Sequence, residues 1–297
     1  MNKLFSVFLV TLAFSTASFA QSKNDVLYLL DGPKEVQVKE VGFNTIKYSY
    51  PNENTLYSVS KHQVTKIEYA SGRAETFESP FKPVNGLDDA QDVYITYNPE
   101  DIAGLHPKGE LFSKATGVTT LSSINNVKNR ALEKLRAEAA MLGANVVFVG
   151  NVYQRGNQYG GENQAGNSTQ TTFTGTGYST ETLDNQAVIA ILAGESYHHY
   201  QTHRLNRNDW NATREISTAY DKNRKPLMFE FDKITEKEDG VYVSSSQIPT
   251  KTRELKVIRA DSEVVILMER NDKIITNYYL ISKENKYFKN IQNRVVL

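Results

Sequence analysis

Cysteine is absent from the 297 residues of the chain, and its absence excludes several kinds of chemistry. The protein has no disulfide bond, no thiol nucleophile, no cysteine-ligated metal and no cysteine that could carry a lipid anchor. Its stability must therefore come from hydrophobic cores alone. A chain of this length is long enough to build two or three ordinary domains in that way.

An excess of either charge is also missing, since Lys plus Arg and Asp plus Glu number 34 each. Without a basic excess or a basic stripe, the chain lacks the electrostatic footprint of a protein that binds nucleic acid or an anionic membrane surface. We expect neither partner. The chain has 17 Tyr but only one Trp, and this balance favours half-buried sheet surfaces.

Long apolar runs are absent after the first 20 residues. Residues 1–20 combine Lys3, an apolar run at 4–14 and the small-residue end Ser18-Phe19-Ala20, which is typical of a cleavable signal peptide. The run is about half the length of roughly 20 residues that a membrane-spanning helix needs. We therefore expect cleavage after Ala20, a periplasmic or secreted location, and no transmembrane segment in the mature chain.

The N-terminal part of the mature chain, residues 21–78, consists of short strand-like runs between turns. The predicted strands are 26–30, 35–41, 45–50, 56–59 and 64–69. Ile46, Tyr48 and Tyr50 alternate with polar residues, which predicts one buried and one solvated face. Five such strands predict a small SH3- or Sm-like β-barrel. Residues 79–91, with two prolines, are predicted to be a linker.

Residues 92–195 are predicted to form an α/β module, with strands at 93–97 and 110–116 and a helix over 123–142. Ser123 suits the start of this helix and Gly143 its end. Its apolar stripe recurs at three- and four-residue steps and comprises Ile124, Val127, Ala131, Leu135, Ala139 and Leu142. The charged residues Lys128, Arg130, Glu133, Lys134, Arg136 and Glu138 are expected on its other faces.

A buried strand at 145–149 and a strand at 169–178 are predicted to lie side by side, joined by a polar, Gly- and Asn-rich hairpin at 155–168. Residues 187–193 are apolar but too short to assign to helix or strand. The last part, 196–297, is predicted to be an all-β sandwich or open barrel. Its predicted strands are 197–205, 227–231, 240–244, 254–259, 263–269 and 273–281. The fold class is therefore α+β, mostly β.

The helix end Ala139-Ala140-Met141-Leu142-Gly143-Ala144-Asn145, with the later Gly175-Thr176-Gly177-Tyr178, carries a resemblance. It resembles the α/β module of heavy-metal-binding-domain-like proteins and of Rcs-type envelope lipoproteins. The whole arrangement also resembles exported multidomain proteins of the Bacteroidetes type, which are mostly of unassigned function. The Rcs-type sensor uses cysteines for its disulfides and lipid anchor, and this chain has none. The resemblance therefore implies a scaffold rather than an activity.

The most suggestive chemical residues are His198, His199 and His203, because imidazoles are good ligands for zinc, copper or nickel. On a helix His199 and His203 would share a face at close range. On a strand, which the pattern favours, the same pair shares a face but lies about 13 Å apart, too far to hold one ion.

Other catalytic patterns are weak: no G-x-S-x-G turn occurs, and Asp88-Asp89 is the most conspicuous carboxylate pair. No cofactor is implied. Tyr153, Tyr159 and Phe173 flank or occupy the polar hairpin and are candidates for contact with a protein or glycan of the cell envelope.

The leading hypothesis is an exported envelope protein that acts by binding another envelope component and has no chemistry of its own. Two alternatives stay open. One is a hydrolase whose carboxylates converge between domains, and the other is a metal-responsive sensor that uses the three histidines.

Overall fold

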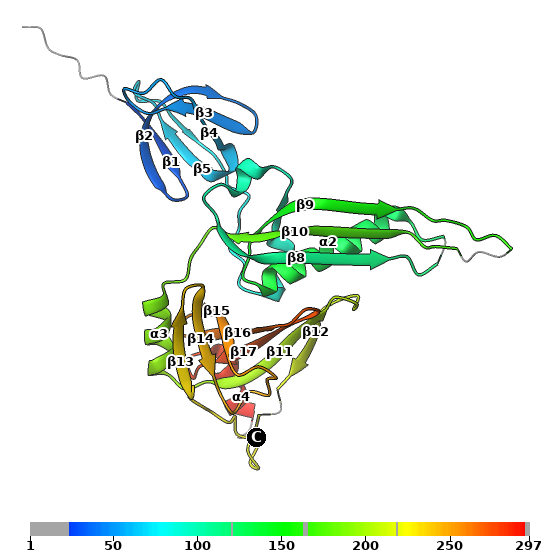
Figure 1. Ribbon diagram of the computed structural model, residues 1–297. Helices are drawn as coiled ribbons and strands as arrows, with labels where there is room; N and C mark the ends of the chain where they lie inside the picture. Colours follow the sequence, from blue (N-terminus) through cyan, green and yellow to red (C-terminus); the bar gives the residue numbers. More distant parts are fainter. Residues whose placement is uncertain (1–23, 120, 163–165, 218, 295–297) are drawn as a thin grey trace, which may run out of the picture. The chain divides into compact units, whose positions relative to one another are not determined.

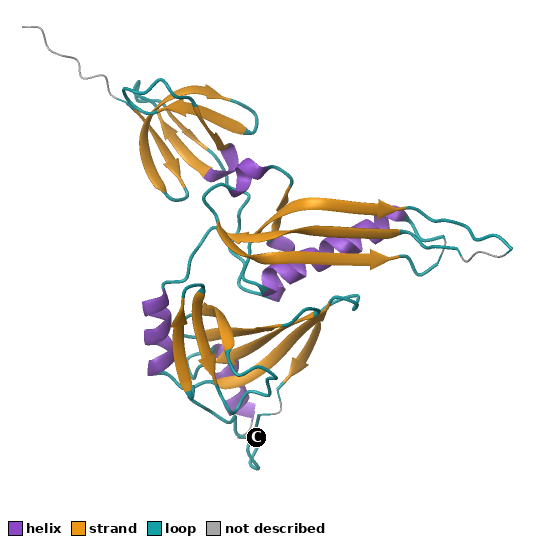
Figure 2. Cartoon of the chain, viewed as in Figure 1, coloured by secondary structure: helices purple, strands orange, loops and turns teal. Residues whose placement is uncertain are grey.

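A computed structural model describes residues 24–119, 121–162, 166–217 and 219–294 (Figure 1). The predicted signal peptide at 1–20 lies outside these residues. The chain divides into two compact units, Met1–Ser79 and Pro80–Leu297. Strands dominate both units and helices are few (Figure 2), which confirms the predicted α+β, mostly β class.

The first unit contains a six-stranded antiparallel sheet in the order β4-β3-β2-β1-β5-β6. Its elements are β1 (Asp25–Leu29), β2 (Gly32–Val41), β3 (Thr45–Ser49), β4 (Tyr57–Ser60), η1 (Lys61–Gln63), β5 (Val64–Glu68) and β6 (Ala74–Thr76). The first half of β2 pairs with β1 and the second half with β3, and a bulge lies between Val38 and Glu40. Because a bulge bends its strand, β2 lets the sheet curl.

The curled sheet encloses one small core, made of Leu27, Val36, Ile46, Tyr48, Val64 and Ile67. The predicted inward positions Ile46 and Tyr48 are confirmed. The prediction of a closed barrel is wrong, because the described strands at the two ends of the sheet, β4 and β6, do not pair with each other. A sixth strand, β6, extends the open end instead of closing it.

The second unit begins with a four-stranded sheet in the order β7-β9-β10-β8. Its elements are η2 (Leu87–Asp92), β7 (Tyr94–Thr96), η3 (Pro99–Ile102), β8 (His106–Thr116), α2 (Ile124–Met141), β9 (Val146–Arg155) and β10 (Gln170–Ser179). The predicted helix, its flanking strands and the pairing of β9 with β10 are confirmed. Gly143 takes a φ of +73°, the left-handed conformation that glycine adopts most readily after a helix.

The rest of the second unit is one seven-stranded antiparallel sheet in the order β12-β11-β17-β16-β15-β14-β13. Its elements are α3 (Asn185–Gly194), β11 (His198–Asn206), β12 (Thr213–Ile216), β13 (Lys233–Lys237), β14 (Gly240–Ser244), β15 (Leu255–Ala260), β16 (Val264–Arg270), β17 (Ile274–Ile281) and α4 (Lys286–Arg294). The seven strands form one open sheet. This architecture resembles the predicted open barrel more than the predicted sandwich, which needs two sheets.

The structure decides one assignment that the sequence left open in this part, and it differs from the sequence expectation in two others. The ambiguous run at 187–193 is helical and lies in α3, where Asp184 caps the first turn by accepting bonds from Gln186 N and Ala187 N. The predicted strand 227–231 makes only an isolated bridge, between Tyr197 and Phe229. Helix α4 was not predicted from the apolar pattern.

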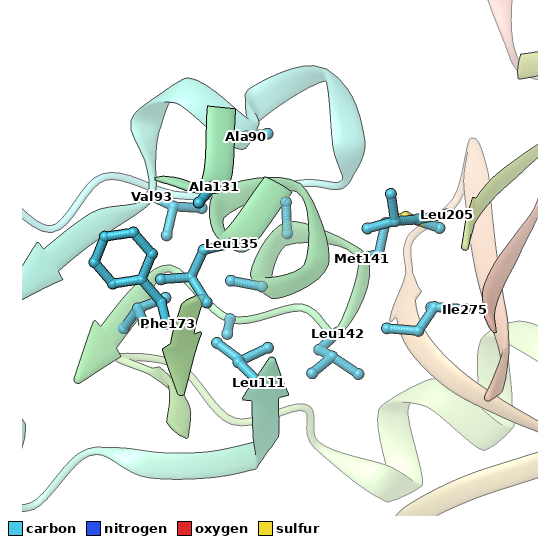
Figure 3. Packing of buried hydrophobic residues seen from close by; sticks show 14 of the residues in the cluster. Ala90, Val93, Leu111, Ala131, Leu135, Met141, Leu142, Phe173, Leu205 and Ile275 are labelled. Atoms are coloured by element: carbon cyan, nitrogen blue, oxygen red, sulfur yellow. The ribbon is translucent and has the colours of Figure 1, made fainter. Parts of the chain in front are cut away.

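Helix α2 is buried on two sides within the second unit. Its predicted stripe faces the four-stranded sheet except at Ile124, which is 38 % exposed, and Val127, Ala131 and Leu135 are fully buried there. Its C-terminal end also packs on the seven-stranded sheet, since Leu205 and Ile275 belong to the same core as Met141 (Figure 3). The Asn277 amide of β17 donates to the Met141 carbonyl at 3.1 Å. One helix thus connects the two sheets of this unit.

Among the residues that the structure describes, no helix has the length and apolar character needed to cross a lipid bilayer.

Candidate functional site

The two edges of the four-stranded sheet differ, and this difference defines the candidate site. At the β8 edge, four backbone groups at alternate residues bond to charged side chains. Arg270 donates to Glu110 O at 2.5 Å, and Phe112 N donates to Glu138 at 3.1 Å. Lys134 donates to Lys114 O at 3.1 Å and Arg130 to Thr116 O at 2.8 Å. These contacts, which we call the β8 seam, block the edge against another strand.

The seam follows from a match between helix and strand geometry. Arg130, Lys134 and Glu138 are spaced by four residues on α2, which corresponds to about 6 Å along a helix. Alternate residues of β8 are about 6.7 Å apart along a strand. Each helix side chain therefore meets the next outward backbone group of the strand.

Two members of the seam are buried charges. Burial lowers the pKa of Lys134, although nearby Asp209 and Glu138 oppose the change. Burial raises the pKa of Glu138, opposed by its bond from Phe112 N and by Arg270 at 3.6 Å. Lys134 also donates to Arg207 O, in the turn that follows β11 of the seven-stranded sheet, at 2.6 Å. The sequence expectation that Lys134 and Glu138 lie on exposed helix faces is wrong, because the second sheet covers them.

The edge formed by β9 is open over most of its length. Strand β7 pairs in parallel with β9 only at Val146, Val147 and Phe148. Beyond this pairing, β10 continues to pair with β9 as far as Arg155, but no described strand lies on the other side of residues 150–155. Residues 150–154 are exposed. The open segment has about the length of an ordinary strand.

Side chains on this open segment do not protect it in the usual way. Edge strands commonly carry charges that discourage pairing. The outer strands of the seven-stranded sheet do so, with Arg214 and Glu215 in β12 and charged residues at both ends of β13. In residues 150–155 the only charge is Arg155, whereas Val152 and Tyr153 are 40 % and 49 % exposed.

The structure separates the three aromatic residues predicted to meet a partner. Tyr153 lies on the open segment, and its register partner on β10 is Thr172. Tyr159 lies in the hairpin beyond it and is 74 % exposed. Phe173 is fully buried in the core beneath α2, so its assignment to a partner surface is wrong. Phe173 alternates with partly exposed residues of β10 and lies on the inner face of the sheet.

Comparisons with protein-family models, with curated proteins and with solved structures found no match. The geometry of the chain therefore carries the functional argument.

The three histidines lie on β11, as the strand interpretation predicts. His199 and His203, however, do not share a face of the sheet as expected. His199 packs against Tyr278 at 5.7 Å between ring centroids, and His203 against Tyr279 at 4.2 Å. Successive residues of a strand point to opposite faces, so these two histidines lie on opposite faces of the sheet. The cause is a register shift between His199 and Gln201, which reverses the alternation.

His198 shares a face with His203 but lies far along the strand from it. Their register partners on β17 are Ile281 and Asn277, four residues or about 13 Å apart. His198 Nδ1 donates to the Leu227 carbonyl at 3.1 Å. Within the described residues, no three His, Cys, Asp or Glu side chains gather closely enough to hold a metal ion.

Burial controls the protonation of these histidines. It lowers the pKa of His203 to about 4; Asp88 opposes the change and Arg214 adds to it. It lowers the pKa of His199 to about 4, and repulsion from His198 adds to the change. All three are buried, so they are core residues of the seven-stranded sheet.

The conspicuous carboxylates Asp88 and Asp89 each have a structural partner. Asp88 pairs with Arg214 of β12 at 2.5 Å. Asp89 accepts a bond from Asn85 N at 2.8 Å, which shapes the segment before η2. Both carboxylates therefore make structural contacts within the second unit.

Proposed function

We propose that this chain is an exported protein that binds another component of the cell envelope and performs no chemistry of its own. We propose further that the partner is a protein, which supplies an extended segment to the open edge of β9. The observation that carries this proposal is the contrast between the two edges of one sheet: the β8 seam closes one, and residues 150–155 leave the other open.

Addition of a strand to an open edge is a common mode of peptide recognition. Backbone hydrogen bonds supply affinity, and side chains at alternate positions supply specificity. Here the incoming strand would meet Tyr153 on one face of the sheet and Val152 on the other. Both side chains are partly exposed in the free chain. Tyr159, beyond the paired strands, would contact whatever follows that segment of the partner.

Site-specific photo-crosslinking tests this proposal. A photoreactive benzoylphenylalanine replaces Tyr153, and the protein is illuminated in an envelope preparation from its own cells. We expect a discrete protein adduct whose yield falls when unlabelled wild-type protein competes. The matched control carries the same group at Ile216, an exposed hydrophobic residue of edge strand β12 that is 75 % exposed.

The position dependence decides the outcome. Adduct formation at position 153 and not at 216 supports the proposal. Equal adducts at both positions, no adduct at either, or an adduct whose added mass a glycosidase removes would contradict it.

A further inference from the structure

A cleft of about 300 Å³ lies beside the β8 seam, within the second unit, and contains the only Trp of the chain. It is formed by β8, by the exposed side of α2 and by the turn that follows β11. Its lining residues are Phe112, Lys114, Ala115, Thr116, Arg130, Lys134, Arg207, Asn208, Asp209 and Trp210. We call it the Trp210 cleft. Its size is at the lower end of the range for small-molecule sites, about 300 to 1,000 Å³.

Two guanidinium groups in this cleft lie over aromatic rings. Arg130 lies 4.3 Å from the centre of the Trp210 ring, and Arg207 lies 4.5 Å from the centre of the Phe112 ring. Stacking occupies the face of a guanidinium and leaves the N–H groups at its edge directed sideways. These edges donate in pairs to carboxylate, sulfate or phosphate oxygens. The rings, and for Arg130 also its bond to Thr116 O, therefore restrict both groups before any ligand arrives.

The charge of the cleft is mainly positive. Lys114, Arg130, Lys134 and Arg207 line it, against the single carboxylate of Asp209. In the described part of the chain, the only side-chain bonds of these four cations go to backbone carbonyls: those of Thr116, Lys114 and Arg207. Carbonyl groups satisfy the donors without neutralising the charge, which Asp209 and the nearby Glu138 offset only in part. A bound anion would neutralise it.

We infer that the Trp210 cleft binds a small acidic sugar, whose carboxylate or phosphate lies between the edges of Arg130 and Arg207. The stacked arginines account for the oxyanion. Trp210, which is 60 % exposed, accounts for the sugar, because an exposed indole offers an apolar surface to a ring that is otherwise polar. This site lies at the sealed edge of the sheet, so the inference does not depend on the proposed strand addition at β9.

The single Trp supplies a direct probe of this site. Titration of the mature protein with galacturonic acid and with glucose 6-phosphate should change the Trp210 fluorescence in a saturable manner. Galactose and glucose, which lack the acidic group, should bind much more weakly. Added salt should weaken the binding of the acidic sugars, because it screens charge pairs that remain partly exposed.

Two variants and a matched control separate the site from general charge effects. Replacing Arg130 or Arg207 by Gln should weaken binding by about tenfold or more, since each charged hydrogen bond contributes about 1.5 to 3 kcal/mol. Arg204→Gln removes the same charge from the exposed part of β11 and should change binding by less than about twofold. Circular dichroism confirms that each variant is folded.

Several results would overturn the inference. These are the absence of any saturable change, equal binding of neutral and acidic sugars, and unchanged binding in both Arg130→Gln and Arg207→Gln. Inorganic phosphate that binds as tightly as glucose 6-phosphate would also overturn it, because the sugar would then contribute nothing.

Discussion

At the scale of single residues, burial decides what the ionisable groups can do. The three histidines of β11 are good metal ligands by residue type, yet each is buried and packs against a tyrosine ring. His203 is fully buried, and neither of its ring nitrogens has a hydrogen-bond partner among the described atoms. A neutral imidazole tolerates this environment, whereas an imidazolium does not.

This environment predicts a pH-dependent stability. An unfolded histidine has a pKa of 6.5, whereas His199 and His203 have folded pKa values of about 4. Between these values the unfolded chain binds more protons than the folded one. The free energy of unfolding should therefore be highest above pH 6.5 and fall as the pH drops towards 4, by up to about 1.4 kcal/mol per pH unit for each histidine.

Urea unfolding at several pH values measures this dependence. His203→Phe keeps an aromatic ring against Tyr279 and should flatten the pH profile. His106→Gln, which removes an exposed histidine of β8, is the matched control. A profile for His203→Phe as steep as that of the wild type would show that His203 is not the responsible group.

At the scale of elements, α2 shows how one helix can serve two layers. Its apolar stripe packs on the four-stranded sheet, while the charged row Arg130, Lys134 and Glu138 closes the edge of β8. Lys134 also reaches the backbone of the turn that follows β11. The helix therefore holds the sheet edge and the second sheet with the same side chain.

Replacing Lys134 by Met tests how much the β8 seam contributes to the stability of the protein. The change leaves the carbonyls of Lys114 and Arg207 without their donor, and an unsatisfied buried polar group costs about 1 to 3 kcal/mol. We expect a loss of that size in the free energy of urea unfolding. Lys128→Met, on an exposed position of the same helix, should change it by less than about 0.5 kcal/mol.

The sequence predicts the helices and strands of this unit better than it predicts which of their side chains are buried. Periodicity and end signals locate α2, β9 and β10 because those cues are local. The burial of Lys134 and Glu138 depends on a sheet some 70 residues or more further along the chain, so local pattern assigns them to solvent. A row of charges at four-residue steps is the one local sign of the seam. The bulge that separates His199 from His203 has no such sign.

At the scale of the whole molecule, the chain consists of two compact units, and the candidate sites lie in the second. That unit is organised around α2, which leaves one edge of the four-stranded sheet sealed and the other open. The sealed edge borders the Trp210 cleft, and the open edge carries Val152 and Tyr153. We propose that these two surfaces serve different ligands: an acidic sugar and an extended protein segment.

Amide hydrogen exchange of the free protein and of its complex with the crosslinked partner tests the central proposal most directly. Pairing of a partner strand with β9 should slow exchange within residues 150–155 by about tenfold or more, while exchange in β8 stays unchanged. Slower exchange elsewhere in the chain, with residues 150–155 exchanging as fast as in the free protein, would contradict the proposal.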